Sequence, residues 1–386
     1  MGERNQQDEH ERSVVEQELS AIREDIKGER FQDLTNDIKS GDWFAKLLAS
    51  ALRTYAEKAT PEFFANKYPG LPPDAVVDRQ VALAKRYAGI SGGVTASAYT
   101  AAVAATIGSQ GGASPLTVPA AFTAFTVDLF YLTTLQLRLA YDMGVLYGKP
   151  ADIEDPEDLY DLLRVAFGVK ATEVAASAIN KAAPEVVRQG VKAAVKGATL
   201  QSLKALPVIG KHLLRRNLIK IGIPAIGIPL SVGMNVWSTG AVAGTARQIY
   251  RDKALADEKA REFVGSFTDH GLLVSVVWAA IRADGPTQPE EMCLLKDLVG
   301  FADQVDGLDA NGGDFGVDLD VESLFAKAAA LGQDERDTLF EAACLAVTID
   351  RKVHRKEKEF LQRLAAVTCV DWDPGRLKET IRRNRV

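Results

Sequence analysis

The chain has 386 residues, of which 47% are hydrophobic and 25% are charged, and its formal net charge is -6. A chain of this length and composition can bury sizeable hydrophobic cores, which excludes a disordered protein and predicts two or three folded units. Its hydrophilic first forty residues contain no basic start followed by an apolar core, so we expect no cleaved export signal. The three cysteines, Cys293, Cys344 and Cys369, form no CxxC pair, which favours a reducing cytoplasm and small, buried thiols.

Hydrophobic residues recur at intervals of three and four along most of the chain, for example in residues 15–26 and 159–166. This spacing is typical of amphipathic helices, and alternating strand patterns with hairpin turns are missing. We therefore expect an all-α fold with two helical domains, separated mainly by the charged stretch 251–262. The expected organisation is a charged helical extension, a first helical domain and a second one, over residues 1–40, 41–255 and 262–386.

Two stretches of the chain carry no formal charge. The first, residues 88–127, has 40 residues, of which 27 are Ala, Gly, Ser or Thr; the second covers residues 221–246. The first is longer than the roughly 20 residues that span a bilayer, but glycine pairs and prolines interrupt it. Small residues allow close helix packing in membranes and in water-soluble bundles alike. Two interpretations therefore stay open: tightly packed helices of a soluble or peripheral protein, or a hairpin that enters the bilayer.

Polar residues stand among apolar ones directly after the first charge-free stretch. Arg138 and Asp142 are four residues apart, so both can lie on one helix face and pair. Buried charges are very costly unless they are paired. The pattern indicates either an internal network that fixes the helix packing or a site for a ligand or lipid headgroup. The candidate polar cluster consists of Asp128, Gln136, Arg138 and Asp142.

The order of these features resembles the EcsC family of bacterial proteins over roughly residues 42–252. A glycine-rich apolar stretch is followed by LQLRLAYDMGVLYG (residues 135–148), a basic segment, and a helix that contains LPVIG and IPAIG. Lys149 and Pro150 depart from the family pattern. The family has no agreed catalytic activity, so the resemblance implies a helical domain and no active site. The matching positions are Asp128, Gln136, Arg138, Tyr147 and Gly148.

Basic residues are concentrated in residues 164–220, where 11 Lys and Arg stand against 2 Asp and Glu. Several of them are spaced to form one stripe on a helix, which suits an anionic membrane surface, although a solvated helix face gives the same pattern. Nucleic acid is not an expected partner, because aromatic residues do not interleave with the stripe and the whole chain is acidic. The candidate membrane-contacting or anion-binding residues are Lys181, Arg188, Lys192, Lys196, Lys211, Arg215 and Arg216.

The C-terminal region contains an internal repeat with an offset of 66 residues. AIRADGPTQPEE (residues 280–291) and AVTIDRKVHRKE (residues 346–357) each end an apolar run with an aspartate and carry a glutamate seven residues later. Apolar positions match before and after these acids. We therefore predict a bundle of two helix–loop–helix copies, in which Pro289 starts the second helix of the first copy.

The repeated acids have two possible roles. As helix caps, the glutamates accept hydrogen bonds from free backbone N–H groups and the aspartates hold their loops. As a cation site, the carboxylates of both copies converge on Ca²⁺ or Mg²⁺. The candidate metal ligands are Asp284, Glu290, Glu291, Asp350 and Glu357.

The repeat pattern also resembles the tellurite-resistance TerB-like domain over roughly residues 266–370. The resemblance rests on Asp284, Gly285 and Glu291 after an aliphatic residue and Ala, and it implies an all-helical module whose acidic residues bind metal. In the second copy Arg351 replaces the glycine, and further basic residues surround the loop. The first copy is therefore the better acidic cluster, with Glu290 as its third member.

No enzyme signature is present, because the sequence lacks a GxSxG elbow, a Walker loop and zinc-ligand spacing. Together the two resemblances imply a non-catalytic bacterial stress-response protein, cytoplasmic and peripheral to the inner membrane. Its first domain would contact the anionic membrane surface, and its second would bind a divalent cation or another stress-response protein. Two alternatives remain: a hydrolase acting on membrane lipids through the polar cluster, and a metal-sensing adaptor.

Overall fold

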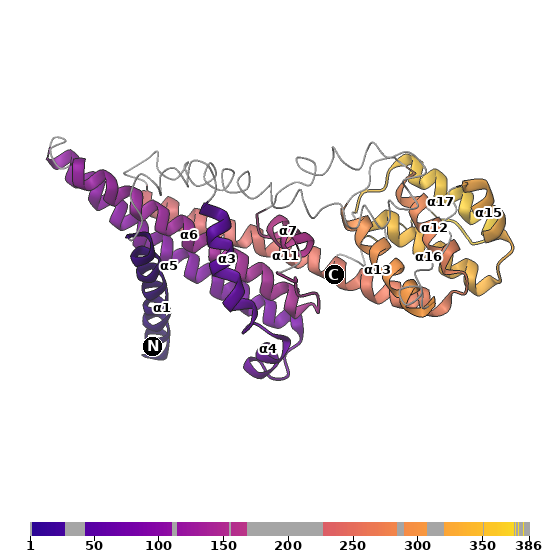
Figure 1. Cartoon of the computed structure of the whole chain (residues 1–386), viewed down its shortest axis with the longest axis horizontal. Helices are drawn as coiled ribbons and strands as arrows, with labels where there is room; N and C mark the ends of the chain where they lie inside the picture. The colour runs from indigo at the N-terminus through magenta and orange to yellow at the C-terminus, as the bar shows by residue number, and fades with distance from the viewer. Residues whose placement is uncertain are drawn as a thin grey trace. The chain divides into compact units, whose positions relative to one another are not determined.

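The computed structural model contains twelve α-helices and no β-strand among the residues that it describes (Figure 1). The all-α fold expected from the hydrophobic periodicity is therefore confirmed. The described residues are 2–27, 43–109, 114–153, 156–167, 227–283, 289–306, 320–349, 351–373, 375, 377 and 381.

These residues form two compact units. The first contains the described residues up to 167 together with residues 227–248, and the second contains those from Ile249 onward. The charged stretch 251–262, expected as the main divide, is helical and belongs to the second unit. The N-terminal helix groups with the first unit.

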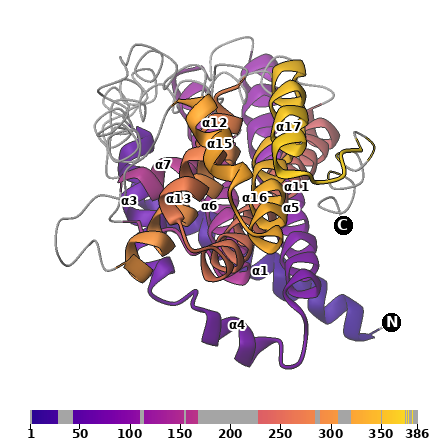
Figure 2. The same cartoon turned by 90° about the vertical axis from the view of Figure 1, so that its right-hand side faces the viewer.

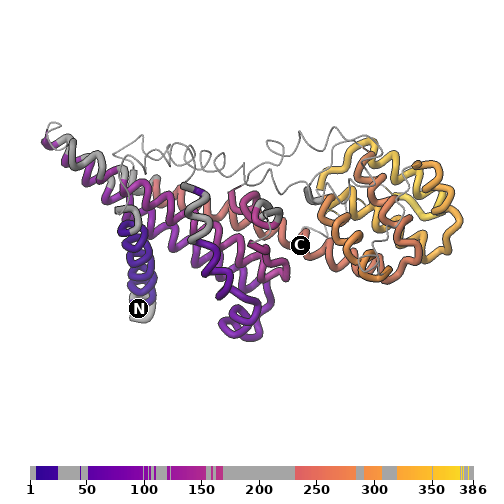
Figure 3. The backbone as a smooth tube through the Cα atoms, viewed as in Figure 1, coloured from indigo at the N-terminus to yellow at the C-terminus, as the bar shows by residue number. Residues whose placement is uncertain are grey.

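The first unit is built on a long helical hairpin (Figure 3). Its helices are α1 (Gly2–Lys27), α3 (Trp43–Ala56), α4 (Pro61–Lys67), α5 (Pro73–Gly108), α6 (Ser114–Leu146), α7 (Pro156–Phe167) and the first part of α11 (Gly227–Ser266). Two hydrogen bonds fix the antiparallel register of α5 and α6: Tyr147 donates to Asp74 at 2.5 Å, and Thr95 donates to Asp128 at 3.0 Å. Helices α1, α3, α4 and α7 pack on α6.

Helix α11 runs antiparallel along α5 at very short range. A Cβ atom on Gly92 would lie 2.9 Å from the Asn235 side-chain nitrogen and 3.0 Å from the Ser231 carbonyl oxygen. Only glycine leaves room for this approach at position 92. Further along the same pair of helices, Arg247 donates to Asp78. None of the helices in the described ranges is both long and apolar enough to cross a bilayer.

We expect Gly92→Ala to destabilise the first unit by about 1–3 kcal/mol, because the added methyl group forces α5 and α11 apart. Urea unfolding followed by circular dichroism measures the change. Gly233→Ala, on α11, is the matched control, since a Cβ there meets nothing within 4 Å. It should stabilise the unit by about 0.5–1 kcal/mol through helix propensity. Equal effects of the two substitutions would contradict the close approach.

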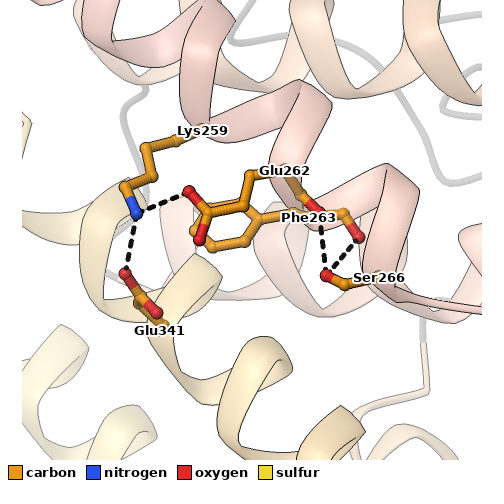
Figure 4. A network of polar contacts seen from close by, with 5 residues as sticks. All are labelled: Lys259, Glu262, Phe263, Ser266 and Glu341. Atoms are coloured by element: carbon orange, nitrogen blue, oxygen red, sulfur yellow. Dashed lines mark hydrogen bonds and ion pairs between the residues drawn. The ribbon is translucent and has the colours of Figure 1, made fainter.

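The second unit is a helical bundle around its own hydrophobic core (Figures 1 and 2). Besides the end of α11 it contains α12 (His270–Ile281), α13 (Pro289–Asp306), α15 (Val321–Ala329), α16 (Gln333–Thr348) and α17 (Arg355–Thr368). Lys259 ties α11 to α16 at the surface: its Nζ lies 2.7 Å from Glu262 and 3.3 Å from Glu341 (Figure 4). The hydrogen bond to Glu262 raises the pKa of Lys259.

The duplicated helix–loop–helix architecture is confirmed in this unit. Helices α13 and α17 begin 66 residues apart, at Pro289 and Arg355. The helix contacts also match under exchange of the copies: α12 packs on α13 and α17, and α16 packs on α17 and α13. Helix α15 precedes α16 as the end of α11 precedes α12, and it packs on α12, α16 and α17. The pairs of equivalent positions that are fully buried in both copies include Leu273 and Leu339, Val277 and Ala343, Ala280 and Ala346, Leu295 and Leu361, and Leu298 and Leu364.

The expectation of three buried thiols is wrong for Cys369, which is exposed. This residue ends α17 in the left-handed conformation, with φ 56°. Val370 N–H donates to the Ala365 carbonyl at 3.1 Å, which completes the helix end. Cys344, by contrast, is largely enclosed, and burial raises the pKa of its thiol to about 12.

Cys369 and Arg351 of the second unit both have positive φ angles, and we expect glycine substitutions at the two positions to have opposite effects on stability. Cys369→Gly should stabilise the unit by about 0.5–1 kcal/mol, because it relieves an unfavourable conformation and removes no hydrogen bond that holds the turn. Arg351, with φ 66°, stands at the repeat position of Gly285. It also donates to the buried Asp252 at 2.7 Å. Arg351→Gly should therefore destabilise the unit by about 2 kcal/mol, since the lost ion pair outweighs the relieved strain.

Denaturant unfolding of the two glycine variants and of Cys369→Ala measures these effects. Cys369→Ala keeps a Cβ atom and should leave the stability near that of the wild type. A stabilising Arg351→Gly substitution would show that the contact with Asp252 contributes nothing net.

Candidate functional site

The predicted polar cluster separates into two groups on different faces of α6. Asp128 and Gln136 lie toward α11, where they connect with Asn235 and Ser238. Arg138 and Asp142 lie toward the helices that cover the opposite side, and both contact Tyr55 of α3. The four residues therefore do not converge on one site.

The first group, which we call the Asp128 group, comprises Asp128, Ser91, Thr95 and Asn235. Asp128 is only 6% exposed, and one of its oxygens, Oδ1, accepts three hydrogen bonds from neutral side chains. The donors are Ser91 Oγ at 3.1 Å, Thr95 Oγ1 at 3.0 Å and Asn235 Nδ2 at 3.1 Å. Hydrogen bonds of this kind compensate for removing a carboxylate from water. The group links α5, α6 and α11 at the point where Gly92 allows their close approach.

Gln136 continues this network along α11. Its Nε2 donates to Ser238 Oγ at 3.2 Å, and Ser238 in turn donates to the Asn235 carbonyl at 3.1 Å. Asp128 and Gln136 thus contact the same segment of α11. Their contacts form the internal network that was one of the two interpretations of the polar cluster. Sequence reasoning missed Ser91 and Thr95, although their four-residue spacing inside a charge-free stretch places both on one helix face.

The second group, which we call the Tyr55 group, comprises Glu18, Tyr55, Arg138 and Asp142. The predicted pairing of Arg138 with Asp142 is wrong: Arg138 Nη1 donates to Glu18 of α1 at 3.3 Å. The Arg138 guanidinium also lies 5.1 Å from the centre of the Tyr55 ring. The Tyr55 hydroxyl lies 2.7 Å and 2.9 Å from the two Asp142 oxygens. Partners from α1 and α3 have replaced the local pair that the spacing suggested.

Within the Tyr55 group, the pKa values of Tyr55 and Asp142 are both raised. Asp142 is 5% exposed, and burial raises the pKa of its carboxyl to about 7, against the opposing effects of the Tyr55 hydrogen bond, Lys67 and Arg138. Burial and the neighbouring carboxylate raise the pKa of Tyr55 as well. Asp142 can therefore change its protonation near neutral pH.

The end of the α5–α6 hairpin is a charge-free surface, which we call the hairpin end (residues 97–109 and 114–125). Thr95 bonds to Asp128, so the 13 residues that follow Thr95, up to Gly108, extend α5 about 20 Å beyond the last buried charge. Ala102 and Ala124 are buried within the hairpin. The exposed residues of the hairpin end are Ser97, Ala98, Ala101, Ala104, Ala105, Gly108, Ser109 and Ala120.

A second exposed apolar feature lies on the charge-free part of α11. Trp237 is 70% exposed, the largest exposure among the large hydrophobic side chains of the described residues. Val236, its neighbour, packs toward Gly89 of α5. The indole of Trp237 is therefore exposed, although the neighbouring Val236 packs at the contact between α5 and α11.

Of the predicted metal ligands in the repeated module, Glu291 and Glu357 are those whose side chains the structure describes. Glu357 is fully buried, and its Oε2 accepts a hydrogen bond from the His354 backbone N–H at 2.6 Å, as the capping interpretation requires. Glu291, its equivalent, is buried as well. Asp284, Asp350 and the side chain of Glu290 lie outside the described residues. Among the acids, histidines and cysteines that are described, no three are grouped to hold a metal ion.

The seven basic residues predicted to contact a membrane or anion, Lys181 to Arg216, also lie outside the described residues. Comparison with known proteins adds no assignment: no protein-family model, curated protein or solved structure matches this chain.

Proposed function

We propose that this protein is a non-catalytic stress-response protein that binds the inner surface of the bacterial membrane, and that the hairpin end is its contact with lipid. The observation that carries this proposal is the exposed, charge-free end of α5 and α6. The EcsC-like and TerB-like patterns suggest the same setting. Membrane binding by this surface would require neither a catalytic site nor a spanning helix.

The dimensions of the hairpin end support a shallow insertion. It extends α5 about 20 Å beyond the Asp128 group, and one leaflet contributes about 15 Å of hydrocarbon. Charged side chains are what chiefly keep a helix out of lipid, and the hairpin end has none. Both of its segments have intrahelical backbone hydrogen bonds over their described helices, so lipid would meet few open backbone groups.

Two further features of the chain favour contact with a bilayer. Trp237 is an exposed aromatic side chain of the type that is enriched at membrane–water interfaces. The basic residues between Lys181 and Arg216 would each add about 1 kcal/mol near an anionic surface. Binding should therefore weaken with salt but persist in part through the hairpin end.

For the second unit we propose a role in binding a cation or a protein partner. Asp284, Glu290 and Glu291 supply the acidic residues of such a cation site, whereas Glu357 already serves as a helix cap. Isothermal titration calorimetry with Ca²⁺ and Mg²⁺ on the wild type and on Asp284→Ala tests this part. Equal heats for the two proteins would remove Asp284 from the proposal.

Co-sedimentation of the full chain with vesicles tests the membrane proposal. Vesicles that contain about one-third phosphatidylglycerol should retain the protein at 50 mM salt, and phosphatidylcholine vesicles should retain less. Protein that stays in the supernatant with both compositions at low salt would refute it.

A further inference from the structure

Helix α3 contacts α6 through both apolar and polar side chains. Phe44 and Leu52 of α3 are buried, and Phe44 meets the Phe167 ring of α7 edge-on at 5.5 Å. The Tyr55 ring packs edge-on against Tyr141 of α6 at 6.3 Å. The Tyr55 hydroxyl then reaches both oxygens of Asp142. This side of the interface thus contains a buried carboxyl whose hydrogen-bond donor is a neutral phenol.

No cation forms an ion pair with Asp142 in the part of the chain that the structure describes. The groups that act on it come from three helices: Tyr55 of α3, Lys67 of α4 and Arg138 of α6. Arg138 lies four residues before Asp142 on α6, but it donates its hydrogen bond to Glu18 of α1. Lys67 lowers the pKa of Asp142 more than Arg138 does, and its ammonium lies over the Phe63 and Tyr68 rings. An ionised Asp142 is consequently buried with a hydrogen bond from the Tyr55 hydroxyl, and with Lys67 and Arg138 near it but not paired with it among the described residues.

We propose that the Tyr55–Asp142 contact is a pH-sensitive joint, in which α3 is firmly seated on α6 while Asp142 is protonated and loosens when this carboxyl ionises. The inference concerns the first unit alone and does not depend on membrane binding.

The direction of the effect follows from proton linkage. The pKa of Asp142 is about 7 in the closed joint, because burial disfavours the charge, and near its ordinary value of 3.8 when opening lets the carboxyl reach water. The open state therefore releases the proton more readily. The open fraction should rise by up to about tenfold per pH unit between pH 4 and 7, and it should level off above pH 7. The joint is thus tightest in acid.

Hydrogen–deuterium exchange of the full chain tests the proposal. Protection factors of α3, corrected for the intrinsic pH dependence of exchange, should fall by roughly 50- to 100-fold between pH 5 and pH 8 in the wild type. Protection of α16, in the second unit, serves as the internal reference and should not follow this curve. A wild-type α3 profile that is as flat as that of α16 would overturn the proposal.

Three variants separate the joint from general loosening. Asp142→Asn keeps a neutral group that can accept the Tyr55 hydrogen bond, so its α3 protection should be independent of pH. Tyr55→Phe should lower the protection at every pH but retain a pH dependence, because Asp142 still titrates. Asp152→Asn removes an exposed carboxyl of the same unit and should behave as the wild type. A pH dependence of α3 that is the same in the wild type and in Asp142→Asn would overturn the proposal.

Discussion

Asp128→Ala is expected to destabilise the first unit by about 3–5 kcal/mol, one of the two largest effects that the structure predicts. The substitution removes the shared acceptor of Ser91, Thr95 and Asn235 at a point where three helices meet, although Thr95 keeps its bond to the Ser91 carbonyl at 2.8 Å. It also opens a cavity that the closely packed helices at Gly92 cannot easily fill. Urea unfolding, with exchange protection of α5 as a local probe, measures the loss.

Asp128→Asn provides the graded control for this prediction. The amide oxygen can still accept hydrogen bonds, but its NH₂ group needs acceptors of its own, so we expect a smaller loss of about 1–2 kcal/mol. Asp78→Ala removes an exposed carboxylate that pairs with Arg247 between the same two helices, and it should cost less than 1 kcal/mol. If Asp128→Ala costs no more than Asp78→Ala, the Asp128 group does not hold the three helices together.

Introducing charge into the hairpin end is expected to abolish most of the membrane binding. Ala101 and Ala105 are exposed and lie one turn apart on α5. The double substitution Ala101→Glu, Ala105→Glu should weaken vesicle binding at least tenfold, because each carboxylate resists transfer into the bilayer by up to about 2–3 kcal/mol. Glutamate is a good helix former and both sites are open, so the fold should be unaffected.

Two variants make this result specific. Ala366→Glu places one added carboxylate on an exposed position of α17, in the second unit, and should bind vesicles as the wild type does. Ala101→Gln, Ala105→Gln is polar but uncharged and should give an intermediate loss. If the double glutamate variant binds like Ala366→Glu, lipid contact through the hairpin end is refuted even if the protein binds vesicles elsewhere.

Local sequence patterns predicted the features of this fold that depend on local spacing. Hydrophobic periodicity predicted the helices, and the 66-residue offset predicted that α13 and α17 start at equivalent positions. The sequence suggested the capping role of Glu357 as one of two interpretations, because it places this residue in the first turn of a predicted helix. The structure shows the capping hydrogen bond. The small residues around Gly92 indicated close helix packing, although not that α11 would be the partner.

Contacts between distant segments could not be predicted in the same way. Arg138 pairs with Glu18, 120 residues away, and Asp142 accepts from Tyr55, 87 residues away. The i,i+4 spacing of Arg138 and Asp142 satisfied a local rule, but α1 and α3 both pack on α6 and supply partners of their own. Arg351 likewise has a positive φ at the position where the first copy has a glycine, and its guanidinium donates to Asp252, 99 residues earlier.

Hydrogen–deuterium exchange of the wild-type chain, with and without phosphatidylglycerol-containing vesicles, tests the membrane contact most directly because it locates the contact without any substitution. Peptides from the hairpin end, residues 97–125, should gain protection when vesicles are added, and peptides from α16 should not change. Vesicle binding that leaves the hairpin end unprotected while protecting another segment would contradict the account, as would the absence of binding.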